Sequence, residues 1–398
     1  MRHARTIIVL LALLGSGPAQ AVEITPGVDA TAYAGIRFTL YEQAEETSGL
    51  KQQPQGDKAA QSVTGFAIDQ ARVRLSGNFL KNQLGLVLEM RLEKGPALLD
   101  AYGEWRFGSW LAVRLGQFKI PSGWENLASD RDLDFSLRPA IEDALADYAL
   151  SRTTYASSLF YGNKSWRRDV GLGLAGDIDI RIGMLRYLAM VSNGLGANLF
   201  IGGTTEREYL LSNKAQFFYG LRVDLLDLFG VARVGAHVSY NRHDNVVFNS
   251  GRTVLDLNRF TWSVDAGFEI PKSGVRAHGT VAGGQINDDF DADGKRDFSF
   301  FGGDVRLIWR LDPLIKHLGG SGWGDAQHFE LGARYERYDT VSDESAFTIR
   351  HHVITSGVQW AYDPYLRLHL EYVVRRTQDP KQKDLKDDAV LFTTIIGW

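Results

Sequence analysis

The chain has 398 residues, 44% of them hydrophobic, with a formal net charge of -4 and no cysteine. Without cysteine it can form no disulfide, no thiolate metal site and no covalent haem attachment. Nucleic-acid-binding proteins are normally basic, so 44 Lys and Arg against 48 Asp and Glu argue against nucleic acid as a partner.

The first 21 residues have the pattern of a secretory signal peptide. Arg2 and Arg5 precede an apolar stretch from residue 6 to 14, and Ala19-Gln20-Ala21 provides a small-residue cleavage site. We predict removal of residues 1–21 and a single exported domain over residues 22–398. The apolar stretch is much shorter than the roughly 20 residues of a membrane-spanning helix. A soluble exported protein remains the alternative at this point.

From residue 28 onward, apolar and polar residues alternate with a period of two, as in strands that are apolar on one face and wet on the other. In the segment 259–270, for example, Phe260, Trp262 and Val264 alternate with Thr261 and Ser263. The pattern predicts about sixteen strands, an even number of the kind found in bacterial barrels. They lie near 28–42, 64–79, 82–93, 97–107, 110–118, 167–176, 178–191, 215–226, 230–241, 257–270, 274–286, 297–310, 327–339, 348–361, 364–377 and 388–398.

The connections between these segments indicate a membrane barrel. Short turns alternate with longer polar connections, and aromatic residues fall on the outward faces near strand ends, which a soluble sandwich does not require. The last segment alternates Val390, Phe392, Thr394, Ile396 and Trp398 on one face. We therefore predict an all-β, transmembrane antiparallel barrel in the bacterial outer membrane, in contact with outer-membrane lipid and lipopolysaccharide. The barrel must close, because lipid offers no water to an open sheet edge.

Charged residues of both signs fall on the inward faces, so the interior must be wet. A barrel of about sixteen strands is too wide to be filled by wall side chains. The predicted basic track consists of Arg72, Arg74, Arg91, Arg106 and Arg114, which lie on consecutive strands. Rings of arginine can select anions. Alternatively, each arginine pairs with a carboxylate on a neighbouring strand and only stiffens the wall.

The connection 119–166 is far longer than a hairpin requires, and loops of this length are usually functional or disordered. We predict that it folds into the lumen and narrows the channel, with a mobile outer cap as the alternative. Lys119, Arg131 and Arg138 within it are further candidate pore-lining residues.

The sequence contains no convincing catalytic or metal site. Asp289 to Gly294 matches the start of an EF-hand loop, but the twelfth position is Phe300 instead of the bidentate Glu. His351 and His352 are adjacent on one strand and must point to opposite faces. We expect no cofactor, no metal and no enzymatic activity, although enzymes on membrane barrels are an alternative that sequence alone leaves open.

One region resembles a known family. Leu115-Gly116-Gln117-Phe118-Lys119-Ile120-Pro121 and the later segment from Ala128 to Phe135 are similar to the corresponding part of the phosphate-selective porins of the O and P type. The resemblance implies a 16-stranded homotrimeric porin whose long loop enters the pore at Lys119. It implies passive diffusion of small hydrophilic solutes, including inorganic anions such as phosphate. The alternative is a plugged barrel that serves as a structural anchor, an adhesin or a scaffold for a partner.

Overall fold

The structure is a computed structural model that describes residues 22–25, 27–42, 65–93, 96–146, 167–193, 209–210, 217–248, 253–271, 273–288, 298–312, 327–342, 349–362, 365–378 and 385–397. The predicted signal peptide, the acidic turn at 289–294 and Trp398 lie outside these ranges. All that follows concerns the described residues.

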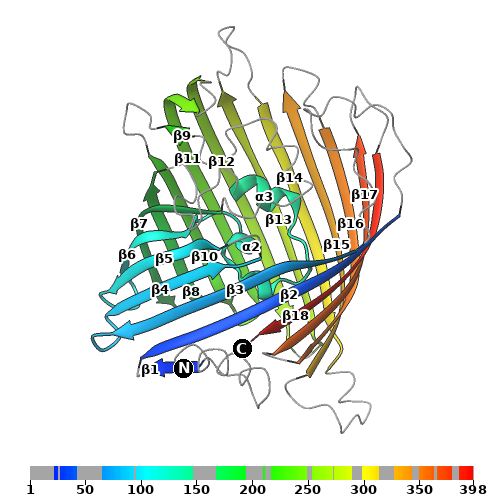
Figure 1. Ribbon diagram of the computed structural model, residues 1–398, viewed down its shortest axis with the longest axis horizontal. Helices are drawn as coiled ribbons and strands as arrows, with labels where there is room; N and C mark the ends of the chain where they lie inside the picture. The colour runs from blue at the N-terminus through cyan, green and yellow to red at the C-terminus, as the bar shows by residue number, and fades with distance from the viewer. Residues whose placement is uncertain are drawn as a thin grey trace, which may run out of the picture.

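Within these ranges, 16 antiparallel strands close into a barrel, which confirms the predicted fold class (Figure 1). Closure follows from the pairing of β18 with β2 and of β8 with β10. The barrel strands are β2 (Val28–Glu42), β3 (Gly65–Phe79), β4 (Leu84–Arg91), β5 (Ala97–Arg106), β6 (Ala112–Lys119), β7 (Arg168–Ile180), β8 (Gly183–Ser192), β10 (Phe218–Leu228), β11 (Ala232–Phe248), β12 (Thr253–Ile270), β13 (Val275–Asp288), β14 (Phe298–Arg310), β15 (Gln327–Ser342), β16 (Ile349–Tyr362), β17 (Leu366–Gln378) and β18 (Leu385–Gly397).

Two short strands and one long hairpin differ from the sequence-based prediction. The strand β1 (Val22–Thr25) pairs with β2, and β9 (Tyr209–Leu210) pairs with the far end of β11. The predicted connection 242–256 is wrong in extent, because β11 and β12 remain paired as far as Val247 and Thr253. Residues 242–245 are all polar and residues 246–248 are all apolar, so this stretch carries no period-two alternation to mark it as strand.

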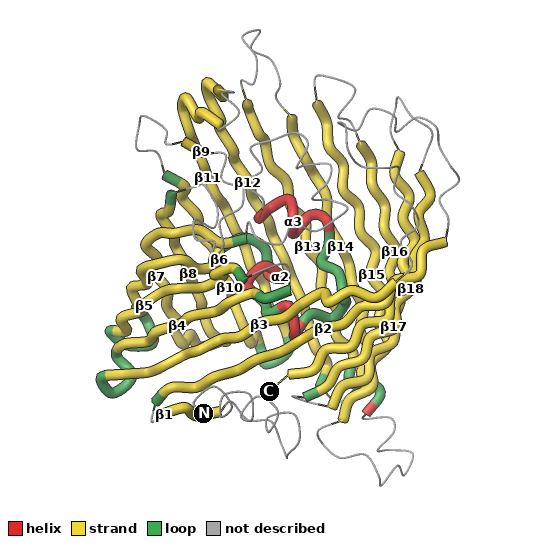
Figure 2. Tube along the Cα trace, viewed as in Figure 1, coloured by secondary structure: helices red, strands yellow, loops and turns green. Residues whose placement is uncertain are grey.

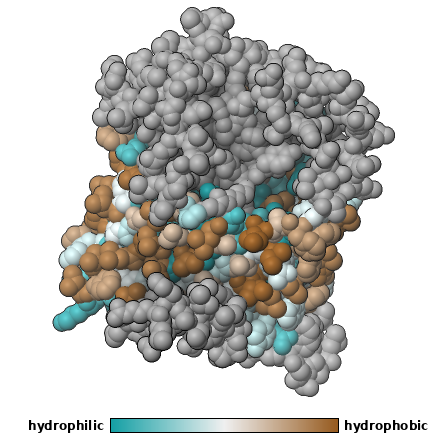
Figure 3. Space-filling model, viewed as in Figure 1, coloured by the Kyte–Doolittle hydropathy of each residue, from teal (hydrophilic) through white to brown (hydrophobic). Residues whose placement is uncertain are grey.

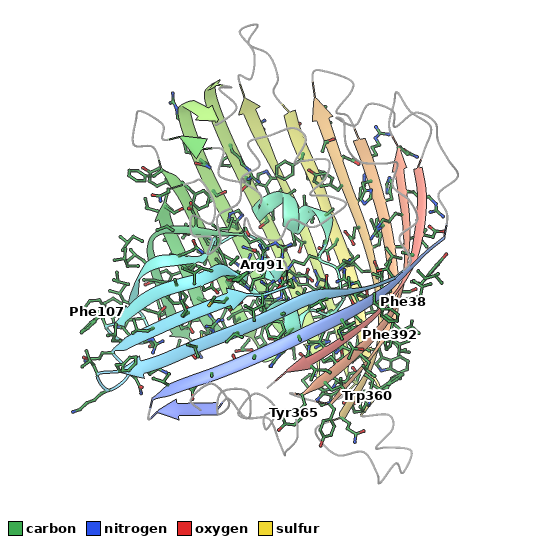
Figure 4. All side chains as sticks on the ribbon, viewed as in Figure 1. Phe38, Arg91, Phe107, Trp360, Tyr365 and Phe392 are labelled. Carbon is green, nitrogen blue, oxygen red and sulfur yellow. The ribbon has the colours of Figure 1, made fainter. Side chains whose placement is uncertain are left out.

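The barrel is apolar outside and polar inside. Leu115 and Val305 are 67% and 64% exposed, whereas Arg222 and Asp265 are 0% and 1% exposed. Apolar side chains gather across the middle height of the visible wall (Figure 3). Phe107, Trp360 and Phe392 project away from the barrel, and Arg91 lies toward its interior (Figure 4). This distribution is the reverse of a soluble protein and matches a wall between lipid and water.

Short helical segments occur in the connection between β6 and β7. They are α2 (Trp124–Leu127), the 3-10 turn η1 (Asp130–Asp132) and α3 (Ala140–Ala146), and α2 and α3 are drawn within the outline of the barrel (Figure 2). No helix among the described residues is long and apolar enough to cross a membrane.

The polarity of the wall can be tested with one outward substitution. Val305 lies in the middle of β14, so Val305→Arg should lower the free energy of unfolding in liposomes by about 2–4 kcal/mol, the usual cost of arginine at the bilayer midplane. The control Phe229→Arg lies at the turn after β10, where the cost should be about 0–1 kcal/mol. Equal effects in urea titrations would contradict this assignment of the outer surface.

Candidate functional site in the barrel lumen

The site starts at the C-terminal end of β6. Gly116 has φ +131°, and a Cβ there would lie 2.2 Å from the carbonyl oxygen of Ala101, so only glycine permits this close approach of β6 to β5. Gln117 then donates hydrogen bonds to the carbonyl oxygens of Leu98 and Leu99, at 2.8 and 2.7 Å. Phe118 is buried, and the strand ends at Lys119. The local backbone thus fixes where the long connection begins.

Residues 122–144 of this connection are hydrogen-bonded to inward-facing side chains of the barrel. Arg334 donates to the carbonyl oxygen of Leu137 at 2.6 Å, and Glu336 accepts from the amide of Ala140 at 3.0 Å. Further contacts of this kind are Ser136 N to Glu371 Oε1 at 2.6 Å, Arg222 to Ser122 O at 3.1 Å and Arg37 to Ser136 O at 3.0 Å. Wall side chains therefore satisfy backbone groups that the irregular segment leaves unpaired.

Apolar contacts add to this attachment. Phe135 is 2% exposed, and the Arg334 guanidinium lies 4.9 Å from its ring centroid. A Cβ on Gly332 would lie 3.0 Å from the Phe135 ring, so the absence of a side chain there makes room for Phe135. Leu137 packs on the buried cluster of Val353, Val373, Ala389 and Leu391.

Two glutamates of the connection have opposite electrostatic environments. Burial raises the pKa of Glu125, but Arg306, Arg334 and Arg138 outweigh burial and hold that pKa below its ordinary value. Glu125 forms an ion pair with Arg306.

Glu142 on α3 is 1% exposed, and neither of its carboxyl oxygens has a hydrogen-bond partner in the part of the chain that the structure describes. Burial, together with Glu125, Asp265 and Asp304, raises the pKa of Glu142 to about 8. Glu142 is therefore largely protonated at neutral pH.

On the other side of the connection the described residues line a cavity of about 390 Å³. It lies between the inner faces of β2 to β6, the start of β7 and residues 126–138 of the connection. Eight basic residues line it: Arg72, Arg74, Arg114, Lys119, Arg131, Arg138, Arg167 and Arg168. Four acidic residues line it: Glu89, Asp100, Asp130 and Asp132. The cavity lining therefore carries an excess of positive charge.

Six of the eight sequence-predicted pore residues line this cavity, and two do not. Arg91 lies opposite Arg72 in the β3–β4 register but outside the lining. Arg106 lies at the end of β5, where it contacts Glu104 and Asn78, each at 2.8 Å.

Sequence reasoning missed Arg167 and Arg168. The available signal was a pair of arginines where the long connection returns to the wall.

Several of these arginines are neutralised locally. Arg74 lies 3.2 Å from Glu89, and Arg114 lies 2.6 Å from Glu104. Arg168 lies 2.7 Å from Asp100. Lys119 instead donates to the carbonyl oxygens of Leu127 and Ala128, at 3.3 and 2.6 Å. Arg74, Arg114 and Arg168 thus have the paired arrangement, whereas selection of anions by the basic residues stays a prediction.

The described residues of the lumen do not form a metal site. Among the described residues, no group of three or more His, Asp or Glu is placed to hold a metal ion. The EF-hand-like turn lies outside the described residues, and Phe300 at its twelfth position is a buried residue of β14.

Comparison with known proteins supports this description. Residues 48–171 match the family model of phosphate-selective porin O and P. No curated protein matches the chain.

Solved structures with the same fold include an anion-selective porin from Comamonas acidovorans, 12% identical over 93% of this chain and 99% of that chain, with a TM-score of 0.61. The outer membrane channel DcaP of Acinetobacter baumannii is 10% identical over 96% and 100% of the two chains, with a TM-score of 0.56. The trimer form of OmpT, an outer membrane protein of Vibrio cholerae, is 12% identical over 94% and 100%, with a TM-score of 0.55.

The pKa of Glu142 makes stability depend on pH. An ordinary glutamate has a pKa of 4.5, so between pH 4.5 and about 8 the folded protein holds a proton that the unfolded chain has lost. This site therefore lowers stability as pH rises through that window. Glu142→Gln should remove up to roughly 4 kcal/mol of this loss, since one pKa unit corresponds to about 1.4 kcal/mol.

The measurement is the unfolding free energy in detergent at pH 5 and pH 8.5. Glu269→Gln, a change at an exposed carboxylate of β12, is the control and should keep the wild-type pH profile. A Glu142→Gln profile identical to that of the wild type would contradict the assignment.

Proposed function

We propose that the chain is a member of the phosphate-selective porin O and P family, whose model matches residues 48–171, and that its lumen cavity makes this passive outer-membrane channel selective for small anions. The observation that carries the proposal is the charge of the lining, eight basic residues against four acidic ones. A narrow passage with excess positive charge lowers the electrostatic barrier for anions and raises it for cations. Phosphate and small carboxylates are the solutes that this chemistry favours.

The connection between β6 and β7 narrows this channel. The connection contacts β10, β14, β15 and β17, and it also contacts Arg37 of β2 and Arg72 of β3, yet a cavity remains along β2 to β6. Space for water and ions therefore remains on the basic side. This arrangement favours a permeable channel over the alternative of a plugged barrel acting as an anchor, adhesin or scaffold. Residues 1–21 would direct export and would be absent from the mature channel.

The side of the barrel built from the short strands β4 and β6, called the low wall below, supports assembly into a homotrimer. The strands β4 and β6 have 8 residues each, against 17 and 18 in β11 and β12. An eight-residue strand at the usual tilt rises only about 20 Å, less than the apolar band of about 25 Å. Large apolar side chains such as Leu86, Trp105 and Leu115 are exposed there. A neighbouring copy would cover this wall better than lipid.

Anion selectivity can be measured as a reversal potential in planar bilayers under a potassium chloride gradient. We expect an anion-signed potential for the wild type. The double variant Lys119→Gln, Arg131→Gln should reduce the anion-to-cation permeability ratio by about twofold to tenfold, because two lining charges are removed.

Arg186→Gln is the matched control for this experiment. Arg186 pairs with Asp177 at 2.8 Å and does not line the cavity, so its removal should leave the ratio unchanged. A cation-signed wild-type potential would refute the proposed selectivity, and a barrel without measurable current would favour the plugged alternative.

An interface on the low wall predicts that substitutions there weaken the trimer more than substitutions elsewhere on the outer surface. Leu115→Lys, on the low wall, should shift the particle from trimer toward monomer in detergent, measured by light scattering after size-exclusion chromatography. Val264→Lys on β12, which is also outward-facing, is the control and should leave the trimer intact. A monomeric wild type, or equal dissociation of both variants, would refute this interface.

A further inference from the structure

Three arginines converge on one carboxylate in the basic cavity. Asp130 Oδ2 lies 3.0 Å from Arg72 Nη2, and Asp130 Oδ1 contacts Arg138. Arg167 Nη1 lies 4.0 Å from the same Oδ1 atom. The three arginines come from different places: β3, the connection after η1, and the residue before β7. Together they form a pocket for a small anion, and Asp130 occupies it.

The arginines offer more donors than Asp130 uses. The side chains of Arg72, Arg138 and Arg167 are 3%, 4% and 7% exposed. Nevertheless, Nε and Nη1 of Arg72 and Nε of Arg138 have no hydrogen-bond partner among the described residues. Buried guanidinium groups with unused N–H donors are suited to an oxyanion, which can accept several of these bonds at once. A larger or second anion would therefore gain contacts that Asp130 leaves unmade.

Asp130 is attached to the connection and not to the barrel wall. It opens the three-residue turn η1, and its own side chain is 14% exposed toward the cavity that it lines. Arg72, in contrast, is anchored in a wall strand, where Glu93 lies 3.5 Å away. Moving Asp130 aside requires a change in a short turn and leaves the barrel hydrogen bonds intact.

We infer that Asp130 is a tethered counter-anion that occupies the oxyanion site of the channel, and that a permeating small carboxylate or phosphate displaces it from Arg72, Arg138 and Arg167. This inference rests on the proposed anion selectivity. In the empty channel Asp130 offsets part of the charge of the three guanidinium groups and lowers their mutual repulsion, while some of their N–H donors stay unused. When an oxyanion arrives, the site exchanges one carboxylate for another and no buried charge is left alone. Because a tethered group competes at a high local concentration, it also keeps the affinity for the solute low enough for release.

The test is block of chloride current by acetate and, separately, by inorganic phosphate in planar bilayers. Asp130→Asn removes the competing charge, so the concentration that halves the chloride current should fall at least about tenfold for the oxyanion that uses the site. Asp177→Asn is the matched control, since Asp177 pairs with Arg186 at 2.8 Å and does not line the cavity. Its effect should stay within about twofold. Asp130→Glu retains the charge and should behave like the wild type.

The possible outcomes distinguish failure of the Asp130 inference from failure of the proposed anion selectivity. Tightening by acetate alone or by phosphate alone supports the inference and identifies the oxyanion. Equal block in Asp130→Asn and Asp177→Asn, with the wild type still anion-selective, overturns the inference and leaves the proposed function standing. A larger conductance for both ions with lost selectivity in Asp130→Asn also overturns it, because Asp130 would then be a structural tie of the connection. A wild type without anion selectivity removes the proposed function itself.

Discussion

The closed ladder of backbone hydrogen bonds is the constraint on which the rest of this structure depends. A strand surrounded by lipid has no water to satisfy its N–H and C=O groups, so every edge must be paired. Pairing of β18 with β2 meets this requirement and turns one face of every strand toward lipid. The other faces enclose a space that wall side chains alone do not fill. The polar lumen, the folded connection and the cavity all follow from that geometry.

The charges of the lumen are held by partners from two sources. Some pairs, such as Arg114 with Glu104, come from neighbouring strands and need only the register of the sheet. Others, such as Arg306 with Glu125, join the wall to the connection between β6 and β7. Buried charges require such partners because desolvation is costly when one is missing. The connection is attached to β10, β14, β15 and β17 and, through Arg37 and Arg72, to β2 and β3, and the cavity with its excess of basic residues lies along β2 to β6.

The sequence predicted arginines on the inward faces of the candidate site, but not which of the charged residues line the cavity. Alternation placed Arg72, Arg74 and Arg114 on the inward faces, and the structure places all three in the cavity lining. It could not separate them from Arg106, whose depth along the wall places it beside Asn78 near the strand end. Arg167 joins the site because the long connection returns there, and its contact with Asp130 spans 37 residues of sequence that no periodic pattern relates.

The sequence by itself determined the strands, their two faces and the long connection, because period-two alternation is a local property that lipid and water impose on every strand separately. It missed the outer part of the β11–β12 hairpin, where a polar run, residues 242–245, is followed by an apolar run, residues 246–248, and the alternation vanishes. Only the tertiary structure decided which charges meet. Asp130 lies beside Arg72 through a contact between residues 58 positions apart in the chain, which no local pattern encodes.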